Sequence, residues 1–187
     1  MNDPGKVIRQ VGKDRFRVLR TSAEIAEDTH RMARELKELA DGQTPVFIGL
    51  LKGSVVFLAD LIRAYDGPHE IDFLSVTRYD PKQKDKHSVR VLHDLATNID
   101  GRVVIVVEGI RTGGTKVEYV ERFLCIHGAA RIYYCAMVRQ KGSVLGPVPL
   151  ETWGFEIDDD EYVVGCGLDL DESYRNLPFI GVKQEST

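Results

Sequence analysis

The feature that most constrains the fold of this chain is the apolar run from Val103 to Val107, which consists entirely of β-branched residues. Such an unbroken run is typical of a strand buried on both faces, as in a parallel sheet. A turn, Thr112-Gly113-Gly114-Thr115, follows it and leads into a segment with helical periodicity. Backbone N–H groups in such a turn, at the N-terminus of a helix, form a cradle for a phosphate. A Gly-Gly pair can also serve only to make a tight turn, so other stretches must decide between these interpretations.

A second strand–turn–helix joint occurs earlier in the chain, at Lys52-Gly53-Ser54. It follows the apolar segment 45–51 and precedes a helix expected over 55–65. A mobile cation, a glycine and a hydroxyl at the positive end of a helix suit the binding of an anion. Considered alone, this joint is more simply explained as a helix cap beside a surface lysine.

The alternation of strands and helices predicts an α/β fold: a doubly wound, mostly parallel sheet flanked by helices. Further elements are expected as a capped helix from Thr21 and strands over 69–77 and 131–138. In such folds the ligand binds at the carboxyl ends of the strands. Lys52, Arg139 and the segment 108–115 all fall at these ends, so we expect them to converge.

Composition narrows the classes of function. The chain has 187 residues, enough for one domain, and its formal net charge of −4 gives no reason to propose nucleic-acid binding. The three cysteines show no metal-ligand spacing and their odd number argues against a disulfide framework, so we expect reduced thiols in a cytoplasmic protein. No apolar run approaches the roughly 18 residues of a membrane span, and the first residues lack a signal-peptide core.

Five spaced motifs are together more specific than any of these features alone. They are Leu50-Leu51-Lys52-Gly53-Ser54; Glu70-Ile71-Asp72-Phe73 with Tyr79; the valine-rich strand ending in Thr112-Gly113-Gly114-Thr115; Tyr162-Val163-Val164-Gly165; and Gly167-Leu168-Asp169 through Tyr174-Arg175-Asn176-Leu177-Pro178. In this order they resemble the hypoxanthine or hypoxanthine-guanine phosphoribosyltransferases, which have the type I phosphoribosyltransferase fold. The resemblance runs from about Thr21 to Gly181.

The resemblance implies an architecture and a reaction. The chain is expected to be a single domain, 1–187, with a core of about 40–150 and a small hood subdomain from the chain ends, about 1–20 and 151–187. The reaction would transfer the 5-phosphoribosyl group from phosphoribosyl pyrophosphate to a purine base and release pyrophosphate, with Mg²⁺ as cofactor. The partners would be these substrates, with neither nucleic acid nor a membrane, and the protein would form a homodimer or homotetramer.

The resemblance also assigns residues to the donor substrate. The Thr112–Thr115 turn would hold the 5-phosphate. Lys52-Gly53 and Arg175 would hold the pyrophosphate, in a family that places a non-proline cis peptide bond before this lysine. Guanidinium suits such a task because it can bind two oxygens at once. Asp169 would bind Mg²⁺, which uses few protein carboxylates beside substrate oxygens.

For the base, the resemblance implies four further roles. Tyr162 would stack on the ring, and backbone groups of Val163 would read its edge. Arg139 stands where the family has a lysine that donates to the 6-oxo group, and an arginine can still donate. The Tyr79 loop would close as a lid over a cation-like ribosyl transition state and keep water out.

The end of the central strand departs from the family pattern at the positions assigned to catalysis and phosphoribosyl binding. The family places two adjacent carboxylates there, whereas this chain has Val107-Glu108. The family's aspartate that accepts or shares the purine N7 proton corresponds to Arg111, which stays protonated and carries five donors and no acceptor. Arg111 therefore cannot be a general base, and losing such a base typically removes ~10²–10⁴-fold in rate.

Three interpretations follow. The first is a working purine phosphoribosyltransferase in which a water or Glu108 partly covers the missing base. The second is a transferase for an anionic or atypical base read by Arg111 and Arg139. Arg78, which replaces a small hydroxyl residue before Tyr79, is a further candidate donor to that base. The third is a non-catalytic binder of nucleotides or phosphoribosyl pyrophosphate with a regulatory role. Donor binding is expected under all three, and Arg111→Asp is predicted to raise the turnover of hypoxanthine.

Overall fold

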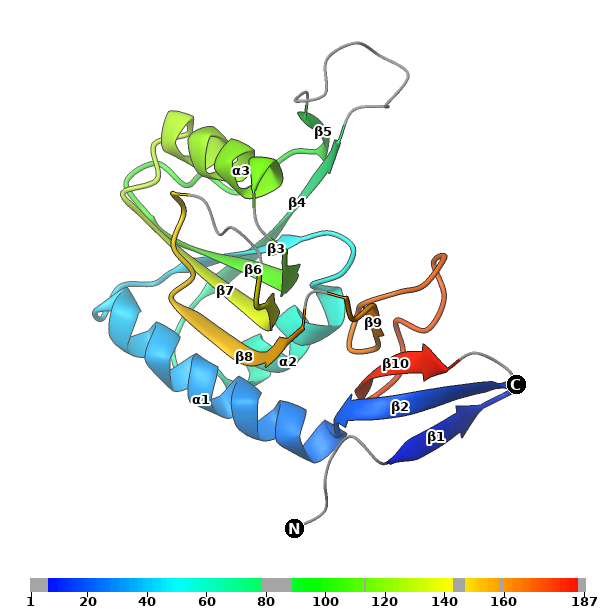
Figure 1. Cartoon of the computed structure of the whole chain (residues 1–187). Helices are drawn as coiled ribbons and strands as arrows, with labels where there is room; N and C mark the ends of the chain where they lie inside the picture. The colour runs from blue at the N-terminus through cyan, green and yellow to red at the C-terminus, as the bar shows by residue number, and fades with distance from the viewer. Residues whose placement is uncertain (1–6, 79–88, 113, 143–146, 159, 185–187) are drawn as a thin grey trace.

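The computed structural model describes residues 7–78, 89–112, 114–142, 147–158 and 160–184 of the chain (Figure 1). Its helices are α1 (Ser22–Ala40), α2 (Val55–Ala64) and α3 (Thr115–Ile126). Its strands are β1 (Ile8–Val11), β2 (Asp14–Arg20), β3 (Val46–Leu50), β4 (Glu70–Arg78), β5 (Val89–His93), β6 (Val103–Arg111), β7 (Arg131–Gln140), β8 (Thr152–Ile157), β9 (Val163–Val164) and β10 (Ile180–Gln184).

Six strands form the main sheet, in the order β5-β4-β3-β6-β7-β8. Neighbouring strands run parallel except at the edge, where β5 is antiparallel to β4. The apolar run Val103–Val107 lies in β6, between β3 and β7, and every residue of the run is buried. The α/β fold with a mostly parallel sheet, predicted from this run, is therefore confirmed.

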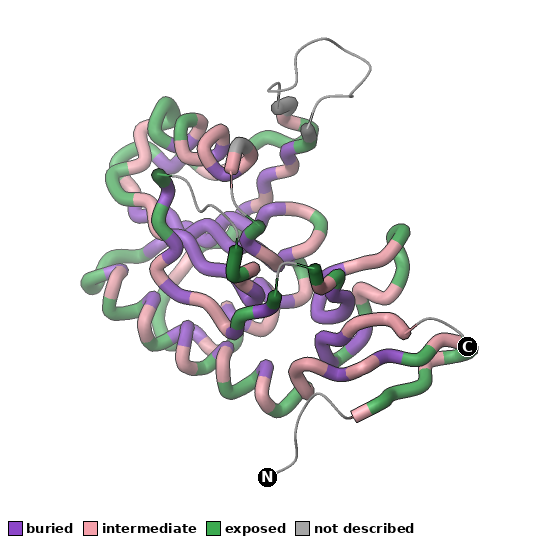
Figure 2. The backbone as a smooth tube through the Cα atoms, in the orientation of Figure 1, coloured by how far each residue is buried: buried purple, intermediate pink, exposed green. Residues whose placement is uncertain are grey.

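Helices cover both faces of the main sheet (Figure 1). α1 and α2 share one apolar core with the sheet, and α3 shares a second core with the opposite face. Ile105 and Val107 enter the first core and Val104 and Val106 the second, which explains why β6 has no polar face. In Figure 2 the backbone of the central strands is coloured mostly as buried. Each fully buried side chain of this size contributes ~1.5–3 kcal/mol.

α1 begins where its sequence predicts. The Thr21 hydroxyl accepts a hydrogen bond from the backbone N–H of Glu24 at 3.3 Å, and the Glu24 carboxylate accepts one from the Thr21 N–H at 2.9 Å. This reciprocal capping box satisfies two amides that the first turn leaves without helical partners. The helix can then bury its apolar stripe against the main sheet, beside β7 and β8.

A second sheet, the hood, comes from the two chain ends. Its four strands are antiparallel, in the order β1-β2-β10-β9, and enclose a small core of their own. The predicted hood is therefore present. However, β8 pairs in parallel with β7 and belongs to the main sheet, so the C-terminal part of the hood begins after Ile157 rather than at about residue 151.

None of the three helices in the described ranges combines the length and the apolar composition that crossing a bilayer would require.

Candidate functional site

The turn after β3 is packed tightly between β6 and the hood. The Leu51–Lys52 peptide bond is cis, as the resemblance implies. The carbonyl oxygen of Gly53 lies so close to two other glycines that a Cβ added at Gly109 or at Gly167 would stand 2.4 Å from it. Only glycine permits this approach at both positions. The Lys52 turn is thus fixed against β6 on one side and against the hood on the other.

Four charged side chains form an alternating chain beside this turn. Arg175 contacts Asp169 at 2.8 Å (Nη1–Oδ1) and Glu172 at 2.9 Å (Nη2–Oε2). Glu172 in turn accepts from Lys52 Nζ at 3.2 Å. Both predicted pyrophosphate-binding cations are therefore brought together, and Glu172, to which sequence reasoning gave no role, joins them.

The segment carrying three of these groups has an unusual backbone. Asp171, Glu172 and Tyr174 all have positive φ angles, of 50°, 62° and 72°. Non-glycine residues adopt this region rarely and at some cost. The Glu172 N–H donates to Asp169 Oδ2 at 2.9 Å, and the Arg175 guanidinium donates to the Gly167 carbonyl at 2.8 Å. These bonds hold Asp169 and Arg175 in place through the backbone.

The predicted phosphate cradle lies at the start of α3. Gly114 is the N-cap, with φ of 78°, and Thr115 is the first helical residue. The Gly114 carbonyl accepts from the N–H groups of Val117 and Glu118. A glycine cap brings no side-chain acceptor to the first turn, which is the arrangement in which a bound anion can take that place. Gly113 lies outside the described residues.

A cavity of 340 Å³ lies between the carboxyl ends of the main strands and the hood. Four residues singled out from the sequence line it: Thr112, Tyr162, Val163 and Asp169. The other lining residues are Ile110, Gln140, Asp160, Glu161 and Leu168. The Tyr162 hydroxyl donates to the Asp169 carbonyl at 3.0 Å, while the residue as a whole is 61% exposed. The structure therefore brings the ring predicted to stack on the base and the carboxylate predicted to bind Mg²⁺ into one cavity.

A larger cavity, of 550 Å³, lies within the hood and shares Tyr162 with the first. Its other lining residues are Lys13, Asp14, Val164, Leu170, Val182, Lys183 and Gln184. It contains none of the residues predicted to bind the donor. Thr112, Tyr162, Val163 and Asp169 meet in the smaller cavity.

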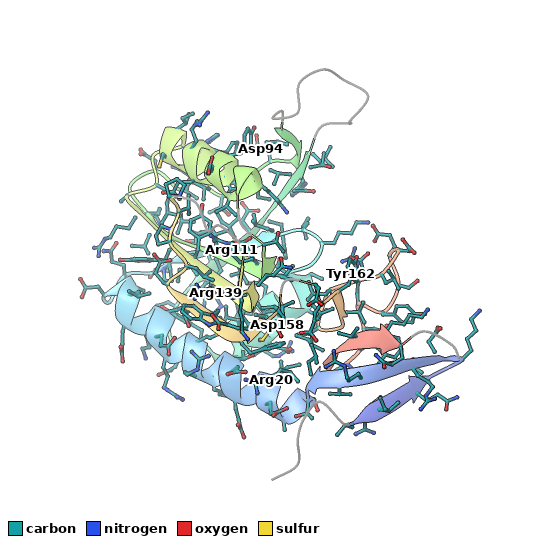
Figure 3. All side chains as sticks on the ribbon, viewed as in Figure 1. Arg20, Asp94, Arg111, Arg139, Asp158 and Tyr162 are labelled. Atoms are coloured by element: carbon teal, nitrogen blue, oxygen red, sulfur yellow. The ribbon has the colours of Figure 1, made fainter. Side chains whose placement is uncertain are left out.

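Glu108 and Arg111, at the end of β6, form a buried ion pair. Arg111 is 0% exposed, and its Nε and Nη2 lie 2.7 and 2.5 Å from Glu108 Oε1. The guanidinium also lies over the Tyr134 ring, 4.8 Å from the centroid, and donates to the Val148 carbonyl at 3.4 Å. Burial raises the pKa of Glu108, and the adjacent guanidinium acts in the opposite direction. Arg111 lies within the body of the molecule and Tyr162 beside the hood (Figure 3).

Arg139 is also engaged within the protein. Its Nη1 lies 3.2 Å from Glu156 Oε1, and its guanidinium stacks over the Trp153 ring at 4.6 Å. Neither Arg139 nor Arg111 is among the described residues that line the 340 Å³ cavity. Tyr79, the predicted lid residue, lies outside the described residues.

The composition of the acidic turn at 158–161 is typical of solvated surface, and Asp158 and Asp160 are exposed in the structure. Asp160 and Glu161 also line the cavity. Glu161 is held there by Arg17 of β2, whose Nη2 lies 2.6 Å from its Oε1. No local signal could have revealed this, because the partner comes from the other end of the chain.

The donor set suits a metal that also binds substrate oxygens. Within the described ranges, no three acidic, histidine or cysteine side chains gather into a metal-binding cluster. Asp169 contributes one carboxylate to the cavity. Mg²⁺ commonly uses one or two protein carboxylates and takes its other ligands from phosphates and water, so the Asp169 carboxylate fits Mg²⁺ bound mainly by a phosphorylated substrate.

Comparison with known proteins identifies the family. The model described as the phosphoribosyl transferase domain matches residues 19–172. The hypoxanthine-guanine phosphoribosyltransferase of Lactococcus lactis subsp. lactis is 35% identical over 166 residues, which cover 89% of this chain and 90% of that protein. The chain belongs to the hypoxanthine-guanine phosphoribosyltransferase family.

Other members support this placement. The hypoxanthine phosphoribosyltransferase of Salmonella typhimurium is 35% identical over 159 residues, 85% of this chain and 88% of that protein. A crystal structure of a hypoxanthine phosphoribosyltransferase from Staphylococcus aureus superposes with a TM-score of 0.83 at 30% identity, covering 89% of this chain and 90% of that one. A hypoxanthine-guanine phosphoribosyltransferase from Bacillus anthracis gives 0.82 at 32% identity, covering 90% and 96%.

Proposed function

We propose that this family member transfers the 5-phosphoribosyl group of phosphoribosyl pyrophosphate to a purine base of the hypoxanthine or guanine type and releases pyrophosphate. The observation that carries this proposal is the 340 Å³ cavity, in which Thr112, Tyr162, Val163 and Asp169 meet. These residues come from separate motifs of the sequence. Their meeting at the carboxyl ends of the main strands, beside the Lys52 turn, is what such a transfer needs, because donor and acceptor must be held against each other.

The donor roles follow from the positions of the charged groups. The turn from Thr112 to Thr115 holds the 5-phosphate at the start of α3. Lys52 and Arg175, which already share a carboxylate, neutralise the pyrophosphate. Asp169 holds Mg²⁺, which supplies positive charge to the leaving pyrophosphate when it is bound.

The acceptor side is where this chain is expected to be slow. Arg111 stands at the position of the family's proton-accepting aspartate, and its guanidinium is occupied by Glu108. Neither residue is then available to accept the N7 proton of a neutral purine. We expect turnover to be lower by ~10²–10⁴-fold than in a member with the aspartate, the usual contribution of a general base.

The buried pair also favours a second candidate function, a protein that binds phosphoribosyl pyrophosphate or a nucleotide without turning it over. An anionic acceptor is less well supported. Asp160, Glu161 and Asp169 line the cavity, and Arg111 and Arg139 are not part of that lining. A negatively charged ring would meet acidic side chains there.

A pyrophosphate-release assay separates these candidates. Phosphoribosyl pyrophosphate and Mg²⁺ are supplied with hypoxanthine, guanine, xanthine or a carboxylated base. Release with the neutral purines supports the purine transferase, and release only with acidic bases supports an atypical acceptor. Donor binding without release under any condition supports the binder.

The cellular setting and assembly belong to the same proposal. We expect a cytoplasmic protein that forms a homodimer or homotetramer. Analytical ultracentrifugation of the purified chain tests the assembly: a single species at the monomer mass across the accessible concentrations would count against it.

A further inference from the structure

The carboxylate of Glu172 lies between two cations that come from distant parts of the chain. Lys52 Nζ lies 3.2 Å from both of its oxygens, and Arg175 Nη2 lies 2.9 Å from Oε2. A carboxylate bound in this way offers anionic oxygens to an ammonium and a guanidinium, as a phosphoryl group does. Glu172 thus makes the contacts that a bound pyrophosphate would make with the same two side chains.

These contacts differ in how easily they can be exchanged. The side chains of Lys52 and Glu172 are each 65% exposed, so water can solvate both groups when they separate. Arg175 is only 21% exposed and is also held by Asp169 and by the Gly167 carbonyl. If Glu172 swings away, Arg175 stays in position with Nη2 available. Hydrogen bonds from Arg175 and Lys52 lower the pKa of Glu172, which is therefore charged at neutral pH.

We propose that Glu172 is an internal competitor for the pyrophosphate site. Its carboxylate bridges Lys52 and Arg175 in the free protein and is displaced when the pyrophosphate group of the donor, or free pyrophosphate, binds. This inference rests on the proposed function, because it assumes that these two cations take the pyrophosphate. The bridge keeps the two cations positioned between reaction cycles, and its breakage reduces the net affinity for pyrophosphate.

Direct titration of pyrophosphate with Mg²⁺ present, followed by calorimetry, tests the inference without a base or turnover. We expect Glu172→Gln to bind pyrophosphate about three- to tenfold more tightly than the unmodified chain, which lies within the combined range for removing its two ion pairs, with Lys52 and with Arg175. The gain should shrink as salt concentration rises, because exposed charges are screened.

Asp171→Asn is the matched control. Asp171 is the neighbouring residue, is exposed, also has a positive φ and loses the same charge, but its carboxylate joins no ion pair within the described part of the chain. We expect its pyrophosphate affinity to change by less than about twofold, the size of a general charge effect. Glu172→Ser provides a second variant at the tested position, and thermal melts verify that all three variants are folded.

Each outcome bears on a different claim. Equal affinity for Glu172→Gln and the unmodified chain overturns the role of Glu172 and leaves the proposed function standing. Weaker binding by both Glu172 variants also overturns it, because Glu172 would then support the ligand rather than compete with it. If no version of the chain binds pyrophosphate, the inference fails together with the donor site.

Discussion

The two sides of the candidate site hold their charges in opposite ways. On the donor side, Lys52 and Glu172 are largely exposed, and their ion pair can be exchanged for a ligand. At the end of β6, Glu108 and Arg111 are buried and bind each other. The cations of the proposed pyrophosphate site can therefore exchange partners, whereas Glu108 and Arg111 are committed to structure. Binding and proton transfer are separable in this fold, and each side can be tested alone.

The largest effect is expected from Arg111→Asp, which introduces the acid that the resemblance predicts at this position. The sequence alone predicts a gain in hypoxanthine turnover. The structure changes that expectation, because the new carboxylate would lie beside buried Glu108 with no cation. Removing one partner of a buried pair costs ~3–5 kcal/mol. We expect urea denaturation to show a loss of this size in the free energy of unfolding, and no gain in turnover.

The matched control removes both charges of the pair. In the double variant Glu108→Gln/Arg111→Met, no ion is left unpaired, and apolar replacement of buried pairs is often neutral. We expect its stability to lie within about 1 kcal/mol of the unmodified chain, close to the ordinary cost of a point mutation. An Arg111→Asp protein that is as stable as the unmodified chain and faster with hypoxanthine would show that the pair is not structural.

On the donor side, Arg175→Ala is expected to weaken binding more than it affects folding. The guanidinium makes charged hydrogen bonds, and the loss of one to a ligand costs ~1.5–3 kcal/mol, or roughly 10- to 100-fold in affinity. Titration with Mg²⁺ and pyrophosphate measures this. Arg63→Ala is the control, because Arg63 is an exposed arginine that pairs with Asp60 of the same helix. Unchanged affinity in Arg175→Ala would remove Arg175 from the pyrophosphate site.

The sequence predicts those features that depend on local pattern. An unbroken β-branched run is typical of an inner strand, and Val103–Val107 indeed lies in β6, between β3 and β7. The capping box at Thr21 sets the start of α1 because both of its hydrogen bonds are made within four residues. The glycine cap of α3 is likewise a local consequence of Gly114.

What the sequence does not predict depends on partners that are distant along the chain. Lys52 and Glu172 are 120 residues apart, and Arg111 reaches a carbonyl 37 residues away. The identity of a residue gives its charge but not what neutralises it. For the same reason Arg111 is read from the sequence as a possible ligand-binding cation, whereas its partner Glu108 and the Tyr134 ring keep it in the interior.

A third carboxylate, that of Asp72, is buried and has no cation partner among the residues that the structure describes. Asp72 of β4 accepts the backbone N–H groups of Phe73 at 2.7 Å, Ala96 at 2.8 Å and Thr97 at 2.7 Å. Burial pushes the pKa of Asp72 upward, but these hydrogen bonds outweigh it and leave the pKa below the ordinary value of 3.8. We expect Asp72→Asn to lower the free energy of unfolding by about 1–2 kcal/mol at neutral pH. The side-chain NH₂ of asparagine would then face a backbone N–H that the carboxylate had accepted.

The effect of Asp72→Asn should depend on pH in a defined direction. A carboxylate with a lowered pKa stabilises the folded protein above its ordinary pKa, and this stabilisation is lost as the pH falls through the lowered value. The difference in unfolding free energy between the unmodified chain and Asp72→Asn should therefore be largest at neutral pH and shrink in acid below about 3.8. A difference that does not vary with pH would mean that the charge of Asp72 contributes nothing.

The smallest effect is expected at Arg139. Its side chain is 26% exposed, between the exposed Lys52–Glu172 pair and the buried Glu108–Arg111 pair. Arg139→Lys introduces the lysine that the resemblance predicts at this position but gives up the stacking on Trp153, which at such sites is worth ~0.5–1 kcal/mol. We expect a loss of stability of that size and a change in hypoxanthine affinity below about fivefold, since tenfold would need 1.4 kcal/mol. Calorimetric titration of the base measures the affinity. A gain above tenfold would place Arg139 with Arg111, as a second position where structure has displaced ligand recognition.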